Sequence, residues 1–163
     1  MIRVGIGYDT HRLEPGLPLT LGGVLIAHSH GLCGHSDADV LSHAIADAVL
    51  GALGQPDIGH FFPPGDASIK GISSLEILAR CRELAAHSGA SLHNVDSTLI
   101  AEAPRIKPHL EAMKRALGGA LGIDPAAVGV KATTNEQLGS LGRGEGMAAM
   151  AVACLDLPRS TPA

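Results

Sequence analysis

The sequence predicts an α+β fold with two layers, in which a mixed four-stranded sheet is covered on one face by helices. Two observations favour this class. Segments with alternating apolar residues, typical of strands, are interspersed with segments of helical periodicity, and no apolar run is long enough to span a membrane. With 163 residues, the chain can bury one core without staples, so we expect a single domain over residues 1–157 and a tail over residues 158–163.

The first predicted strand lies in "IRVGIGY" and stops near Gly7, just before "DTHRLEPG". Side chains alternate between the two faces of a strand, so Asp9 and His11 share one face and the apolar residues of this segment share the other. Gly5 and Gly7 leave the face of Asp9 bare. That face therefore has room for another backbone or for a ligand.

Next in order, "LPLTLGGVLIA" predicts a hairpin that turns at Gly22 and Gly23, and "HSHGLCGHS" predicts a loop. The segment "DADVLSHAIADAVLGALG" has helical periodicity up to a glycine. Ser36 and Asp39 have the spacing of a capping box at its start. We therefore expect the first helix to begin close to Ser36.

The rest of the chain continues the same mixture of elements. A long loop rich in Pro and Gly is expected over residues 55–74, and a loop of this length is often functional. A second helix is expected to begin at Ser73 or Ser74 and to end at Gly89. A strand in "NVDSTLIAE", a loop and then a helix in "APRIKPHLEAMKRALGGALG", a strand in "AVGVKAT", a glycine-rich loop and a final strand in "MAAMAVACLDL" complete the order.

Composition excludes several functional classes. The formal net charge is −4 and the isoelectric point is near 6.1, which argues against binding DNA or an anionic membrane through a basic surface. One Tyr, two Phe and no Trp leave few rings for stacking on bases. Three cysteines without a CxxC spacing suit a reducing compartment. We therefore expect a cytoplasmic protein that binds neither nucleic acid nor membrane.

The residues also suggest a metal site. His43, inside the first predicted helix, is the third ligand expected beside Asp9 and His11, and Asp39 is placed one turn earlier to orient its ring. Two His and one Asp leave a tetrahedral ion one position short, which is typical of catalytic zinc. The alternatives are a surface pair at a strand end for Asp9 and His11, and an i,i+4 helix pair for Asp39 and His43.

Other residues could bind phosphate. His35 and Ser36 lie at the expected start of a helix, where unpaired N–H groups favour anions. In "KATTNE", hydroxyls and the Glu136 carboxylate follow a strand end, a combination that can hold phosphate and a hard cation such as Mg²⁺. Simple capping and solvated side chains are the alternatives. Four cations beside glycine- or proline-bearing loops could neutralise a polyanionic substrate: Arg105, Lys107, Lys131 and Arg143.

Several blocks occur in one order: "GIGYDTHRL", "GHSDADVLSHAIADAVLGALGQPDIGHFFPPGD", "NVDSTLIAEAPRIKPH", "VKATTNEQLG" and "GRGEGMAA". Together they closely resemble the 2-C-methyl-D-erythritol 2,4-cyclodiphosphate synthase family, over nearly the whole chain. The resemblance implies a homotrimer with active sites between subunits. It implies a cyclising phosphorus-oxygen lyase of the non-mevalonate isoprenoid pathway, in which the 2-phosphate of 4-diphosphocytidyl-2-C-methyl-D-erythritol 2-phosphate attacks its own β-phosphate and releases CMP.

The resemblance also implies roles for individual residues. Asp9, His11 and His43 match zinc ligands, Glu136 matches the ligand of Mg²⁺ or Mn²⁺, and His35 and Thr134 match residues that stabilise the transition state. An isoprenoid diphosphate is implied on the trimer axis, near Arg143 and Glu145. The residues implied to bind substrate are Asp9, His11, His35, Ser36, Asp57, Ile58, Gly59, Phe62, Asp66, Ala101, Pro104, Arg105, Ile106, Lys107, Thr133, Thr134, Asn135, Glu136 and Arg143.

Two other functions remain open from the residues. A zinc phosphohydrolase would bind water at the open metal position and give linear products. A non-catalytic trimeric scaffold would use the metal only to tie the helix to the strand.

Overall fold

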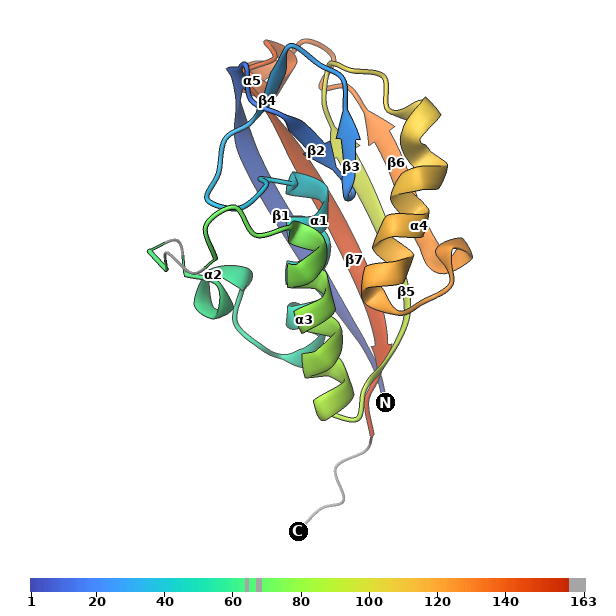
Figure 1. Ribbon diagram of the computed structural model, residues 1–163. Helices are drawn as coiled ribbons and strands as arrows, with labels where there is room; N and C mark the ends of the chain where they lie inside the picture. The colour runs from blue at the N-terminus through green and yellow to red at the C-terminus, as the bar shows by residue number, and fades with distance from the viewer. Residues whose placement is uncertain (64, 67–68, 159–163) are drawn as a thin grey trace.

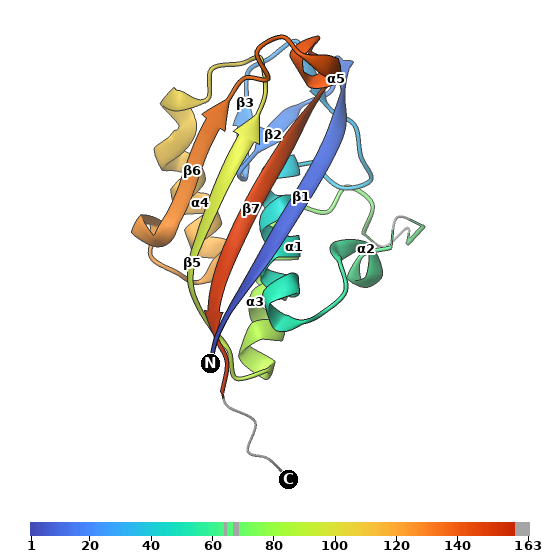
Figure 2. The ribbon, with the colours of Figure 1, turned by 180° about the vertical axis from the view of Figure 1, so that it is seen from behind.

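The computed structural model describes residues 1–63, 65–66 and 69–158, so the expected tail lies outside the described residues from 159 onward. One main sheet has helices on one face, while its other face is open when seen from behind (Figures 1 and 2). The sheet has five strands in the order β4-β1-β7-β5-β6. Their bounds are β1 Ile2–Pro15, β4 His30–Leu32, β5 Ser91–Ile100, β6 Val128–Thr133 and β7 Gly146–Asp156.

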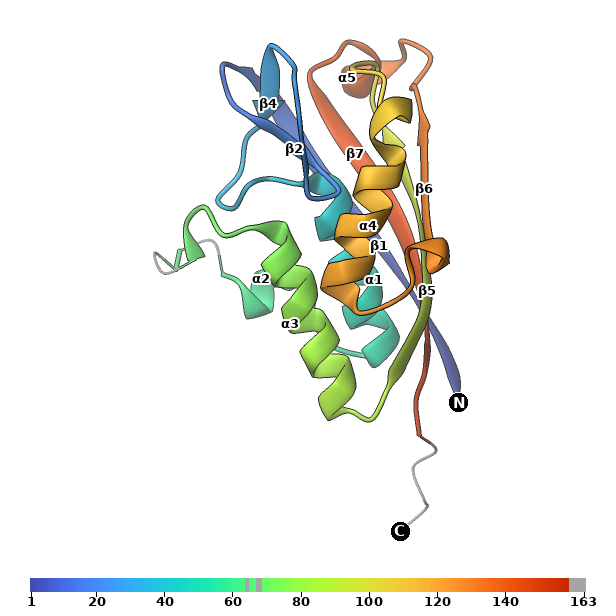
Figure 3. The same ribbon diagram turned by 45° about the vertical axis from the view of Figure 1, so that its right-hand side comes forward.

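Three long helices cover one face of this sheet (Figure 3). They are α1 Val40–Leu53, α3 Ser74–His87 and α4 Leu110–Leu121. The short helices are α2 Ile58–Phe61, η2 Lys107–His109, η3 Pro125–Ala127 and α5 Gly139–Gly142. The predicted hairpin forms as β2 Leu19–Leu21 and β3 Val24–Ile26, but as a sheet of its own. No helix in the described ranges has the length and apolarity needed to cross a membrane.

The predicted four-stranded sheet is wrong by one strand, and the first strand is longer than expected. β1 runs on past Gly7 because β7 pairs with it as far as Arg12, opposite Gly146. Its last residues pair with β4, which was expected to be a loop, and Leu13 lies opposite Leu32. Asp9 and His11 are therefore held in the middle of a paired strand.

The bare face of β1 is filled by the backbone of α1. A Cβ on Gly5 would lie 2.0 Å from the carbonyl oxygen of Ala48, and one on Gly7 would lie 1.9 Å from that of Ala44. Only glycine permits this approach, which confirms the expectation that another backbone could use the space. The close contact brings the helix that carries His43 directly over the strand that carries Asp9.

The first helix is capped by Asp39, and the expectation of a capping box at Ser36 is wrong. The Asp39 carboxylate is fully buried and accepts the N–H groups of Leu41 and Ser42 at the helix start. It also accepts the N–H groups of Gly22 and Gly23, at 2.9 and 2.7 Å. One side chain thus fixes both the start of α1 and the turn of the hairpin.

The two faces of the sheet differ sharply in burial. Beneath the helices lies an aliphatic core, whose largest fully buried side chains are Leu19, Leu21, Leu41, Ile45, Leu50, Leu78, Leu99, Met113, Leu117, Leu121, Met147 and Leu155. On the opposite face of β1 and β7, large apolar side chains are exposed: Ile2, Val4, Ile6, Tyr8, Met150 and Val152. This second face has no cover within the described chain (Figure 2).

Candidate active site and metal centre

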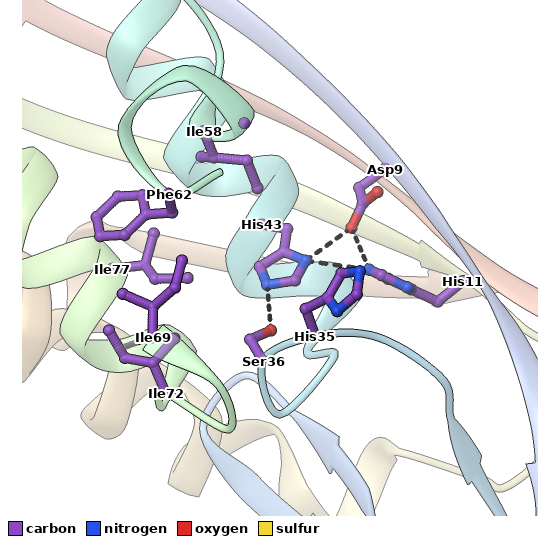
Figure 4. Close-up of a pocket in the computed structure, with 11 residues that line it drawn as sticks. Asp9, His11, His35, Ser36, His43, Ile58, Phe62, Ile69, Ile72 and Ile77 are labelled. Carbon is purple, nitrogen blue, oxygen red and sulfur yellow. Dashed lines mark hydrogen bonds and ion pairs between the residues drawn. The ribbon is translucent and has the colours of Figure 1, made fainter. Parts of the chain in front are cut away.

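Three ligand atoms converge where β1 meets α1 (Figure 4). The Oδ2 atom of Asp9 lies 3.0 Å from Nε2 of His11 and 2.9 Å from Nδ1 of His43, and the two nitrogens are 3.1 Å apart. The structure therefore brings together the three predicted metal ligands. Zinc with bonds of about 2.0–2.1 Å separates tetrahedral ligands by about 3.3 Å, so the triad needs only a slight expansion to hold it.

The hydrogen bonds on the far sides of both rings support a cation at this point. Nδ1 of His11 lies 2.8 Å from the carbonyl oxygen of Cys33, to which it can only donate. Nε2 of His43 lies 3.0 Å from the hydroxyl oxygens of Ser36 and Ser74. With those outer nitrogens protonated, both inner nitrogens present lone pairs towards a carboxylate. Three acceptors facing one another need a proton or a metal ion between them.

The electrostatics of the triad are dominated by burial and by the mutual contacts. Burial raises the pKa of Asp9, but the hydrogen bonds and charges of His11 and His43 outweigh it and hold that pKa well below its ordinary range. Burial lowers the pKa of His11, yet the Asp9 carboxylate outweighs it and raises the pKa above the ordinary 6.5. A proton therefore competes with a metal ion for the lone pair of His11.

The group that orients the His43 ring is not the one that the sequence suggested. The Asp39 carboxylate is committed to the helix cap and to the hairpin, so it does not reach the ring. The ring instead contacts Ser36 and Ser74, and the Ser74 hydroxyl donates to Asp37. Sequence reasoning missed Ser74 and Asp37, because no spacing links the start of α3 to the site.

The triad forms the polar end of a cavity of about 180 Å³. His35 and Ser36 line it from the loop before α1, and the other end is apolar (Figure 4). The lining residues outside the triad are His35, Ser36, Ile58, Gly59, Phe62, Ile69, Ile72 and Ile77. The Asp47 carboxylate accepts the N–H of Ile58 at 2.8 Å and so fixes the start of α2 beside the cavity.

A second cavity of about 230 Å³ lies at the ends of β5 and β6. Many predicted substrate residues line it: Ala101, Pro104, Arg105, Ile106, Lys107, Thr133 and Thr134. Glu102, which the sequence did not single out, also lines it and accepts the N–H groups of Asn135 and Gln137, at 2.9 and 3.3 Å. Glu102 thereby shapes the loop that presents Glu136.

The structure does not bring all predicted site residues together. Strands β1 and β6 are separated by β7 and β5, so the triad and the loop of Glu136 lie three strand spacings apart, roughly 14 Å. Asp57 caps α2 and lines a separate cavity with Asp47, and Asp66 lies outside the residues that line the first cavity. The exposed Arg143 donates from Nε to Glu145 at 2.7 Å.

The fold and the site together define a class of protein: a metal-dependent α+β enzyme whose incomplete ligand set opens onto a small-molecule cavity. The chain belongs to the YgbB family, whose model matches residues 2–156. The 2-C-methyl-D-erythritol 2,4-cyclodiphosphate synthase of Akkermansia muciniphila is 64% identical over 155 residues, which cover 94% of this chain and 92% of that protein. The resemblance found in the sequence is confirmed.

Solved structures agree with this family. The bifunctional IspDF of Campylobacter jejuni is 39% identical with a TM-score of 0.92; the match covers 96% of this chain and 42% of that longer chain. The IspF of Plasmodium falciparum, solved as a CDP complex, is 34% identical with a TM-score of 0.84, and the match covers 98% of this chain and 97% of that one. Both matches cover nearly the whole of this chain.

Proposed function

We propose that this chain converts 4-diphosphocytidyl-2-C-methyl-D-erythritol 2-phosphate to 2-C-methyl-D-erythritol 2,4-cyclodiphosphate and CMP. An oxygen of the 2-phosphate forms a bond to the β-phosphorus, and the bond from that phosphorus to the α-phosphate oxygen breaks, so that CMP leaves with its electron pair. The Asp9, His11 and His43 cluster carries the proposal, in a chain 64% identical to a synthase of this name.

Zinc is the ion that we assign to this cluster, because the donor set is one carboxylate and two imidazoles with room for a further ligand. When bound, the ion would neutralise charge on the phosphate oxygens of the substrate. His35 and Ser36 line the same cavity, and we assign to them hydrogen bonds to those oxygens. The same cavity is also lined by Ile58, Gly59 and Phe62. We assign these residues, with Asp57 and Asp66, to binding the erythritol part of the substrate.

The second cavity is the proposed site of the cytidine and its diphosphate. Two relatives were solved with CDP, and Arg105 and Lys107 supply positive charge here. Thr133 and Thr134 supply hydroxyl donors, and the Thr134 hydroxyl lies 3.3 Å from Oε1 of Glu136. Glu136 is exposed and, with Mg²⁺ or Mn²⁺ bound, would share the charge of the diphosphate.

A homotrimer would reconcile the two cavities. The first cavity lies beside β1 and the second lies at the ends of β5 and β6, so neither cavity of one subunit contains both sets of assigned residues. The exposed apolar face of β1 and β7 supplies a surface for assembly. We therefore propose that the triad of one subunit faces the second cavity of its neighbour. We assign Arg143 and Glu145 to the trimer axis, where the arginine could bind an isoprenoid diphosphate. We assign the enzyme to the cytoplasm.

The direct test is incubation with the authentic substrate, with and without a chelator, followed by phosphorus NMR. The proposal predicts cyclic diphosphate and CMP in equal amounts, and none after the metal is removed. Linear phosphates that contain oxygen from water would instead indicate a phosphohydrolase. Intact substrate with full metal occupancy would indicate a scaffold.

The second ion is tested separately with Glu136→Gln. This change keeps the shape of the side chain and removes the charge that we assign to Mg²⁺. We expect the Mg²⁺ concentration for half-maximal turnover to rise by about tenfold or more, with zinc content unchanged. An unchanged Mg²⁺ titration would mean that Glu136 does not bind this ion.

A further inference from the structure

A chain of hydrogen bonds lies behind His43, on the side away from the metal site. The Ser74 hydroxyl oxygen is 3.0 Å from Nε2 of His43 and donates its hydrogen to Oδ1 of Asp37. The N–H of Ser74 donates to Oδ2 of the same carboxylate at 3.0 Å. Ser74 is fully buried, so no solvent competes for its hydroxyl. Asp37 therefore holds Ser74 by two bonds in one orientation.

This arrangement fixes which ring nitrogen carries the hydrogen. Because the Ser74 hydroxyl hydrogen is committed to a carboxylate, only a lone pair of its oxygen faces the ring. Nε2 of His43 must then donate, which leaves Nδ1 as the bare nitrogen that faces Asp9 and His11. A ring in the opposite tautomer would place two lone pairs 3.0 Å apart behind it and a hydrogen in the metal site.

Ser36 cannot fix the tautomer in the same way. Its oxygen is also 3.0 Å from Nε2 of His43, and it accepts the N–H of Ala38 at 3.1 Å. Its own hydrogen is not committed to a carboxylate, and because Nε2 of His43 is a donor, that hydrogen can point away from the ring, towards the cavity that Ser36 lines. The tautomer is therefore determined by Ser74 and Asp37, and the Ser36 hydroxyl remains available to donate to a phosphate oxygen.

Further hydrogen bonds join the loop before α1 to the start of α3, so the contact between Asp37 and Ser74 is one of several between these two segments. The N–H of Asp37 donates to the carbonyl oxygen of Ile72 at 3.1 Å, and the N–H of Gly71 donates to that of His35 at 2.8 Å. These bonds hold the carboxylate beside the first residue of α3. They also fix the position of His35 relative to that helix.

We infer that Asp37 and Ser74 are positioning residues of the metal centre: through a carboxylate–hydroxyl–imidazole relay they hold His43 in the tautomer whose Nδ1 binds the ion. The inference rests on the metal site of the proposed function. It assigns to α3 a part in metal affinity, although no residue of that helix contacts the triad's ligand atoms. Groups of this kind typically change metal affinity by 10–100-fold when removed.

The test measures zinc affinity by competition with a chelator, and the His43 tautomer by ring-nitrogen NMR of the zinc-free protein in alkaline buffer. For Ser74→Ala we expect zinc affinity to fall about 10–100-fold, and the wild-type Nε2–H signal to be replaced by a mixture of tautomers. Asp37→Asn keeps an acceptor and removes the charge. We expect it to lower zinc affinity less, by about 3–10-fold, in the same direction.

Ser73→Ala is the matched control, since it removes a hydroxyl from the adjacent serine. Ser73 caps α3, with its hydroxyl oxygen 3.3 Å from the N–H of Leu75, and it has no contact with His43. We expect a lower thermal midpoint with zinc affinity and tautomer unchanged. A purely structural role for Ser74 would instead make the two serine variants alike.

Wild-type zinc affinity and tautomer in both Ser74→Ala and Asp37→Asn would overturn the inference. If Ser74→Ala does not fold, Asp37→Asn decides alone. A wild-type protein that binds no zinc would overturn the proposed function itself. Wild-type zinc binding and cyclic product with unaffected variants would overturn only the relay.

Discussion

The two faces of strand β1 differ sharply in what lies against them. Gly7 has no room for a Cβ because the carbonyl oxygen of Ala44 fills that space, whereas the side chain of Ile6, one residue away, is 67% exposed. Asp9 and His11 continue the inner face at the point where α1 brings His43 within reach. The outer face continues with apolar side chains as far as Tyr8.

Because side chains alternate along a strand, one strand can carry two functions, one on each face. On the inner face, glycine has no side chain, so the backbones of the strand and the helix come into close contact. This contact fixes the distance between strand and helix. That distance determines whether His43 can meet Asp9 and His11. On the outer face, the same strand presents exposed apolar side chains, which we assign to the proposed contact between subunits. Substitutions on the two faces should therefore affect the protein in different ways.

The largest effect is expected for Gly7→Ala, on the inner face. A Cβ there would meet backbone atoms of α1 at 1.9 and 2.8 Å, so the helix must move away. We expect a loss of about 3 kcal/mol or more in unfolding free energy, together with loss of zinc binding. Chemical denaturation and zinc titration measure both. Gly119→Ala in α4, where a Cβ meets nothing within 4 Å, is the control and should not destabilise the protein.

His43→Ala should separate the chemistry from the fold. It removes one of three ligands without placing an atom in a contact, so we expect turnover to fall by more than about 100-fold while the assembly persists. Zinc content and CMP release are the measurements, and size-exclusion chromatography follows the assembly. Zinc-dependent turnover close to that of the wild type would contradict the assignment of this ligand.

A charge on the outer face should break assembly and spare the inner face. We expect Ile6→Glu to raise the concentration for half-assembly by about tenfold or more, because an interface would have to bury the carboxylate. The zinc affinity of each subunit should stay unchanged. Analytical ultracentrifugation reports the first and zinc titration the second. Leu25→Glu is the control, since Leu25 is equally exposed at 69% but lies on the separate hairpin.

The smallest effect is expected from pH. The pKa of His11 is raised by Asp9 above 6.5, so in the zinc-free protein this residue contributes stability that is present below 6.5 and lost as the pH rises through the folded pKa. Zinc affinity should change in the opposite sense, falling by about tenfold per pH unit below that pKa. Thermal unfolding with and without zinc measures both trends. In His11→Gln, where this proton is absent, both trends should weaken.

Local patterns in the sequence predict the inner face well. The alternation of β1 places Asp9 and His11 together, and Gly5 and Gly7 correctly indicate the close approach of another element. The helical periodicity around His43 correctly gives the helix that carries it. These features depend on residues within a few positions of one another. Local chemistry is therefore enough to predict them.

Long-range pairing explains what sequence reasoning missed. β4 is three residues long and exists only because the end of β1 pairs with it. Asp39 caps α1 in place of Ser36 because the hairpin turn supplies two more N–H groups to its carboxylate. Ser74 reaches His43 only after α3 packs beside α1, 31 residues away in the sequence. No local pattern in the sequence indicates these contacts.

Anomalous diffraction at the zinc edge, from crystals grown with the ion, would locate the metal of the proposed site. We expect one strong peak per subunit within about 2.0–2.2 Å of Oδ2 of Asp9, Nε2 of His11 and Nδ1 of His43, with a further ligand from the cavity. A peak at other residues, or an empty triad in crystals of protein that turns over substrate, would contradict this assignment.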